Sequence, residues 1–104
     1  YIDIFFSCSL ISSLIYPTMD KRILELRQQI DELDEEIIQF LKKRMRISKE
    51  VGKLKEELDI PVEDKNRENE IIDRLIQQAG RNLSEEQLIR IFTAVFNSSK
   101  QIQN

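Results

Sequence analysis

The sequence contains no histidine and only one cysteine, Cys8. Histidine is the usual general base near neutral pH and the commonest metal ligand, so both of those roles are missing. A single cysteine excludes a disulfide framework and a thiolate metal site. Any catalysis by this chain must therefore depend on carboxylates, amines or electrostatic stabilisation, and we expect neither a metal nor a cofactor.

Glycine and proline number only two each, which is too few for a loop-rich or all-β fold. Charged residues make up 34% of the chain, but both signs are mixed along it and the net charge is only -3. This mixture does not indicate a nucleic-acid-binding surface. A chain of 104 residues suggests one domain with a small core, for which oligomerisation is a natural supplement.

The first eighteen residues, "YIDIFFSCSLISSLIYPT", differ from the rest because they are apolar and serine-rich, with Asp3 as their only charge. They lack the basic start and the cleavage site of a secretory signal, and the run is short and interrupted for a membrane span. We expect residues 1–18 to lie upstream of the natural start or to be an adventitious extension. A signal or anchor and an added helix are the alternatives. The functional domain is then 19–104.

A long amphipathic helix is predicted from about residue 20 to 58, without a proline. Its apolar positions repeat every 3.5 residues over five heptads, which is typical of a helix that packs against a partner helix. At 1.5 Å per residue the helix is about 58 Å long, too long for the remaining chain to cover. Ten of the eleven seam positions are apolar, and the exception is Arg44: Ile23, Leu26, Ile30, Leu33, Ile37, Phe40, Arg44, Ile47, Val51, Leu54 and Leu58.

Two shorter helices are predicted to follow. Pro61 disfavours helical geometry at the preceding residue, so the long helix ends before it. A second helix is expected over 64–79, with Gly80 as a left-handed C-terminal cap. Ser84 and Gln87 form the pattern of a capping box, which starts a third helix that continues to the C-terminus. The predicted fold class is all-α, a three-helix protomer with one very long N-terminal helix that forms an intertwined helical-bundle dimer.

Polar residues interrupt the apolar faces of all three predicted helices. Burying a charge without a partner is unfavourable by many kcal/mol, so Arg44 needs one. Internal ion pairing is one interpretation, with Arg44 matched to Glu68 or to a carboxylate of a partner chain. The other is that the polar stretches meet in a cationic pocket for a small anion, most plausibly a dicarboxylate, which arginine can grip through two hydrogen bonds. The residues concerned are Arg44, Ser48, Lys55, Asp64, Arg67, Glu68, Ser99 and Gln103.

From about residue 23 to 103, the chain resembles the chorismate mutases of the all-helical class. The matching segments are "LRQQIDELDEEII", "RMRISKEVGKLK", "PVEDKNRENEII" and "IFTAVFNSSKQIQ", in the order and with the spacing of that family. The resemblance implies an isomerase that rearranges chorismate to prephenate in phenylalanine and tyrosine biosynthesis, on the shikimate pathway. It also implies a cytoplasmic homodimer without membrane or nucleic-acid partners.

The resemblance implies roles for eight residues. Arg27 and Arg44 correspond to two arginines that grip the substrate carboxylates, with Arg27 supplied by the partner subunit. Lys55 and Gln103 correspond to donors to the ether oxygen of the breaking bond. The remaining substrate-binding positions are Asp64, Arg67, Glu68 and Ser99.

The implied reaction explains the missing histidine, because an intramolecular rearrangement requires no nucleophile, metal or proton relay. Donors aimed at the ether oxygen stabilise the negative charge that develops there. Two alternatives remain at this point. An isochorismate-pyruvate lyase of the same fold would use a similar cationic pocket, and a helical dimerisation module would have no chemistry at all.

Overall fold

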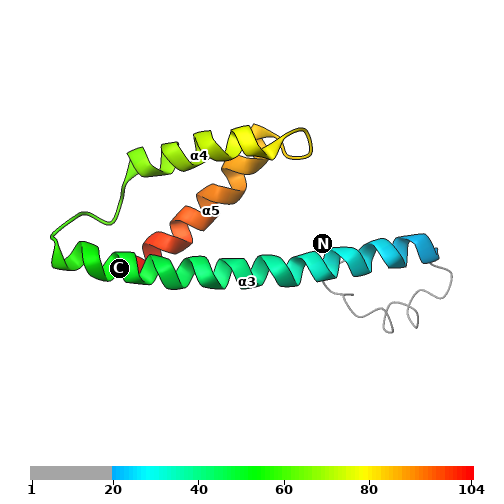
Figure 1. The fold of residues 1–104 in the computed structure, drawn as a ribbon, viewed down its shortest axis with the longest axis horizontal. Coiled ribbons are helices and arrows are strands. Elements are labelled where there is room, and N and C mark those ends of the chain that lie inside the picture. Colours follow the sequence, from blue (N-terminus) through cyan, green and yellow to red (C-terminus); the bar gives the residue numbers. More distant parts are fainter. Residues whose placement is uncertain (1–19) are drawn as a thin grey trace. The chain divides into compact units, whose positions relative to one another are not determined.

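The computed structural model describes residues 20–104, which form three α-helices and, within that range, no strand. These are α3 (Lys21–Glu57), α4 (Lys65–Ala79) and α5 (Glu85–Gln103), as Figure 1 shows. The all-α class and the long-short-short order of the predicted helices are confirmed. The prediction for 1–18 lies outside the described residues. The described chain falls into two units, one up to Lys42 and one from Lys43 to Asn104.

The sequence predicts the end of α3 correctly, but Pro61 is only part of the reason for it. The backbone N–H of Ile60 donates to the carbonyl of Lys55 at 2.8 Å, and that of Asp59 donates to Glu56 at 3.3 Å. This pair of bonds is the Schellman motif, which requires a left-handed residue just after the helix. Asp59 takes that conformation with a φ of 56°. A non-glycine residue therefore turns the chain, and Pro61 prevents the helix from resuming.

The two shorter helices begin where the sequence predicts, α4 at a cap that was not predicted and α5 at the predicted capping box. The Asp64 carboxylate accepts the backbone N–H of Arg67 at 3.0 Å at the start of α4. The capping box of α5 is complete, because Ser84 and Gln87 each accept the other's backbone N–H, at 3.1 and 3.0 Å. Gly80 follows α4 with a φ of 67°, but its ψ of -146° lies outside the left-handed helical region. The predicted left-handed cap is therefore wrong in ψ, and Gly80 takes a conformation that is essentially restricted to glycine.

The second unit contains the buried apolar residues of the described chain, Ile71, Leu88 and Phe96. They come from α4 and α5, which pack against each other. Phe92 extends this cluster, with its ring centroid 6.0 Å from that of Phe96. The C-terminal end of α5 reaches the part of α3 that belongs to the same unit (Figure 1). The core is small, and it fixes the α4–α5 pair that carries one wall of the site described below.

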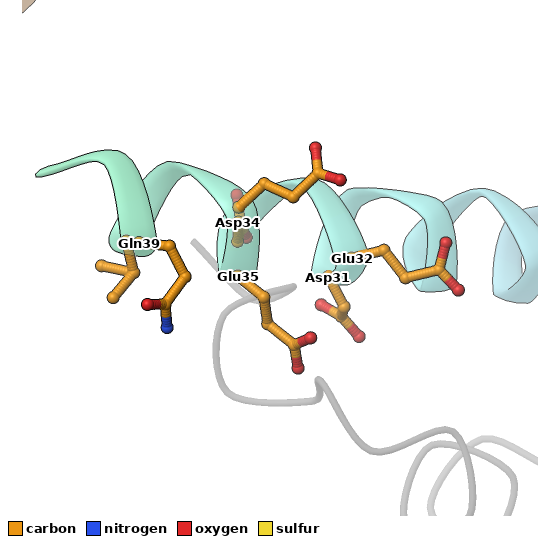
Figure 2. A pocket seen from close by; sticks show the side chains of 7 residues that line it. Asp31, Glu32, Asp34, Glu35 and Gln39 are labelled. Carbon is orange, nitrogen blue, oxygen red and sulfur yellow. The ribbon is translucent and has the colours of Figure 1, made fainter. Parts of the chain in front are cut away.

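The first unit contributes the N-terminal part of α3, whose seam residues from Ile23 to Phe40 are exposed in the single chain. The same part of α3 carries four acidic residues close together in the sequence, Asp31, Glu32, Asp34 and Glu35. Figure 2 shows that these side chains spread over the helix surface rather than converge on one point. Among the described residues, no acidic cluster could hold a metal ion, and no helix could span a membrane.

Candidate functional site

A cavity of about 310 Å³ lies within the second unit, between α3, α4, α5 and the segment that joins α3 to α4. Its apolar wall includes Val51, Ile71 and Phe96. Seven of the eight predicted site residues line it: Arg44, Lys55, Asp64, Arg67, Glu68, Ser99 and Gln103. The eighth, Arg27, lies on α3 in the first unit, so its contribution from a partner subunit stays a prediction.

Arg44 is held at the cavity by a hydroxyl and an aromatic ring. Its Nη1 donates to the Oγ of Ser99 at 2.6 Å, and its Cζ lies 5.8 Å from the centroid of the Phe96 ring. Burial, followed by the nearby positive charge of Arg67, lowers the pKa of the Arg44 guanidinium from its ordinary value. The alternative interpretation, an ion pair between Arg44 and Glu68, is not what the structure shows, because Glu68 pairs with Lys65 and Lys100. Arg44 is therefore positioned by neutral groups.

Lys55 and Gln103 meet on another side of the cavity. The Lys55 ammonium donates to the backbone carbonyl of Val62 at 2.8 Å and to the Oε1 of Gln103 at 3.4 Å. The first bond ties the last turn of α3 to the segment before α4. The second fixes the orientation of the amide: because its oxygen faces Lys55, its NH₂ group is left to donate elsewhere. Lys55 and Gln103 can thus present two donors to one ligand.

The acidic side of the cavity is ordered by lysines and by a helix start. Glu68 lies 3.2 Å from the ammonium of Lys100 and 3.8 Å from that of Lys65. Asp64 serves as the cap of α4, and Arg67 pairs with Glu70 at 2.6 Å. Each of the three predicted residues at the start of α4 therefore has a structural partner as well as a place in the cavity wall.

One charged residue of the cavity wall, Lys100, was not among the predicted site residues. It lies four residues after the buried Phe96 and three before Gln103, on the same face of α5. That spacing could have identified it. Its distance from Glu68 depends on how α4 and α5 cross, which the sequence alone does not show.

The charges that line the cavity leave an excess of positive charge. Two carboxylates, of Asp64 and Glu68, face four cations: Arg44, Lys55, Arg67 and Lys100. Four minus two gives a net charge of +2, which matches a small dicarboxylate. Within residues 20–104, neither Arg44 nor Lys55 has a carboxylate at ion-pair distance, since both bond only to neutral acceptors. These two cations are preorganised for an anionic ligand.

Comparison with known proteins gives a consistent result. The model of the family "Chorismate mutase type II" matches residues 26–104. The chorismate mutase of Methanocaldococcus jannaschii is 31% identical over 86 residues, which cover 82% of this chain and 87% of that protein. The bifunctional chorismate mutase/prephenate dehydratases of Aquifex aeolicus and Escherichia coli are 26% and 32% identical over 80% and 79% of this chain. The matched parts are only 24% and 22% of those longer proteins. No solved structure matches significantly.

Proposed function

Because the chain belongs to the chorismate mutase type II family, we propose that it isomerises chorismate to prephenate, a step of aromatic amino-acid biosynthesis. The observation that carries the proposal is the pair of cations, Arg44 and Lys55, which are held by neutral groups in a cavity of net positive charge. Chorismate carries two carboxylates and an ether oxygen, which match the cations and donors of this cavity.

The proposed mechanism is electrostatic. Arg44, oriented by Ser99, grips one carboxylate and keeps the substrate compact, with its reacting carbons close together. As the C–O bond breaks, negative charge develops on the ether oxygen. The Lys55 ammonium and the Gln103 amide NH₂ donate to that oxygen, and the hydrogen bond between the two residues keeps them in place. Donors that are fixed before the reaction lower its barrier, by roughly 2.7–4 kcal/mol for each one.

The second carboxylate is proposed to be bound by Arg27 of a partner subunit. Arg27 and Lys55 are 28 positions apart on α3, about 42 Å at 1.5 Å per residue. A ligand of the size of chorismate does not span that length. The exposed apolar seam of α3 supports an antiparallel two-fold dimer, in which each site combines one chain's Arg44, Lys55 and Gln103 with the other chain's Arg27. A cytoplasmic location is part of the proposal, and cell fractionation would test it.

The test of the reaction is a chorismate-consumption assay on residues 19–104, with Lys55→Ala compared with Lys53→Ala. Lys53 is an exposed residue of the same helix outside the cavity, so it controls for loss of a lysine. We expect prephenate as the product, a 10²- to 10³-fold loss of kcat for Lys55→Ala and normal turnover for Lys53→Ala. Salicylate and pyruvate from isochorismate would instead indicate the lyase. No turnover of either substrate would indicate a dimerisation module.

The shared site is tested by mixing an Arg27→Ala chain with a Lys55→Ala chain under conditions that allow subunit exchange. In the heterodimer one site collects both defects, while the other receives an intact Lys55 and an intact Arg27. Two nearly inactive homodimers should therefore give a heterodimer with roughly half the activity of the unmodified dimer, by two-fold symmetry. A purified heterodimer without recovered activity would show that Arg27 does not act in trans.

A further inference from the structure

Gly52 lies directly against the last residue of α5. It is buried on α3, three positions before Lys55. A Cβ atom added to Gly52 would lie 2.7 Å from the Cα of Gln103, 2.9 Å from its Cβ and 3.0 Å from its Cγ. Atoms at such distances overlap, and one of them belongs to the backbone. Any side chain at position 52 must therefore displace the end of α5.

Neither backbone conformation nor helix stability explains a glycine at this position. Gly80, and not Gly52, is the glycine with a positive φ among the described residues. In the interior of a helix, glycine is about 1 kcal/mol less favourable than alanine. The contact with Gln103 is thus the feature of the structure that requires the absence of a side chain.

We propose that Gly52 is a positioning residue, which sets the place of the Gln103 amide in the cavity. The proposal rests on the proposed function, in which that amide donates to the ether oxygen. The bond from Lys55 to the Oε1 of Gln103 is already long at 3.4 Å, so a small outward shift of α5 breaks it. The amide then loses both its position and its orientation, while Ser99, one turn earlier, keeps its bond to Arg44.

The inference is tested by a double-mutant cycle of Gly52→Ala and Gln103→Ala, with kcat, KM and unfolding free energy measured for each variant. We expect Gly52→Ala to lower kcat at least tenfold with little change in KM, because the displaced donor acts mainly in the transition state. In the Gln103→Ala background, the same Gly52→Ala change should alter kcat less than twofold. The loss of stability should be equal in both backgrounds, because the Cα and Cβ of residue 103 remain.

Gly80→Ala is the matched control. No atom lies within 4 Å of a Cβ at that position, but the positive φ penalises alanine. This variant should lose stability and keep its kcat. Equal losses of kcat from Gly52→Ala with and without the Gln103 amide would overturn the inference, as would a Gly52→Ala protein without helical structure. If the unmodified protein does not turn over chorismate, the proposed function itself is wrong. If the unmodified protein is active but the effects of Gly52→Ala and Gln103→Ala on kcat simply add, only the inference about Gly52 is wrong.

Discussion

The two parts of α3 follow the same heptad pattern but differ in burial: the first part buries no residue in the single chain, and the second buries two small residues. Up to Lys42, the apolar seam is exposed in the single chain, with Leu33 at 57%. From Lys43 onward, the buried residues of the helix are Ser48 and Gly52, while Ile47 remains 61% exposed. The small and polar residues are thus inside, and a large apolar residue is outside.

This inversion shows that α3 carries two different stripes. The apolar seam is the stripe proposed to pack against a second copy. A second stripe, Arg44, Ser48, Gly52 and Lys55, is named here the pocket stripe, and it faces the end of α5 and the cavity. Arg44 belongs to both stripes. The seam is apolar except at Arg44, and the pocket stripe is small or polar, although Ile47 and Val51 of the seam also line the cavity.

The largest effect should come from placing a charge in the seam. Leu33→Glu would bury a carboxylate in the proposed two-fold contact, so we expect monomers and complete loss of turnover, because each site would lose its Arg27. Sedimentation equilibrium and the chorismate assay measure both effects. Gln39→Glu places the same charge on the opposite face of the helix and should leave the dimer intact. A normal dimer of Leu33→Glu would contradict the role assigned to the seam.

The next effect concerns the donor at the end of α5. Gln103→Glu should lower kcat by 10²- to 10³-fold at pH 7, because a carboxylate cannot donate to the ether oxygen. Activity should rise as the pH falls toward about 4.3, where the carboxyl group of glutamic acid is protonated and donates again. The neighbouring Lys55 ammonium favours the charged form and shifts the rise to lower pH. A flat pH–rate profile would exclude a direct contact.

A smaller effect concerns the rim of the cavity, where Lys100 pairs with Glu63 and Glu68. The hydrogen bond to Glu68 raises the pKa of Lys100, and the hydrogen bond from Lys100 lowers the pKa of Glu63. The raised pKa contributes stability below about pH 10.4 that disappears as the pH rises through the folded-state value. The lowered pKa contributes stability above about pH 4.3 that disappears as the pH falls.

Lys100→Met should therefore be less stable than the unmodified protein between these limits, and the difference should shrink outside them. Urea unfolding across the pH range measures this. Lys49→Met, an exposed lysine of α3 outside the cavity, is the control and should show no such pH dependence. A difference that does not change with pH would assign Lys100 a packing role instead.

The smallest effect should be a gain of stability at the end of α3. Asp59 is left-handed with a φ of 56°, a conformation that glycine adopts without strain. Asp59→Gly should raise the unfolding free energy by about 0.5–1 kcal/mol and leave turnover unchanged, because the pocket stripe ends before it. Asp73→Gly, in the interior of α4, should lower stability. Equal effects of both changes would show that the left-handed conformation is not strained.

Local signals in the sequence predicted the helices to within about one residue, because their starts and stops depend on neighbours. Ser84 with Gln87, Asp64 and Pro61 each act within a few positions along the chain. The left-handed Asp59 was missed because only a few per cent of non-glycine residues have a positive φ, even though aspartate is enriched among them.

The sequence predicted which residues form the site, but not which of them contact one another. Seven of the eight predicted residues line one cavity, yet the alternative in which Glu68 neutralises Arg44 looked equally plausible from the sequence. Which cation pairs with Glu68 depends on the crossing of α4 and α5. The contact between Gly52 and Gln103 joins residues 51 positions apart and leaves no periodic signal.

The Gln103 donor lies in the last turn of α5, where the Asn104 N–H also bonds to the carbonyl of Lys100 at 3.2 Å. Terminal turns of helices open with far less free energy than the whole domain. Because Gln103 contacts Gly52 and Lys55 of α3, opening this one turn would remove a donor from the cavity and leave the Ile71, Leu88 and Phe96 cluster in place.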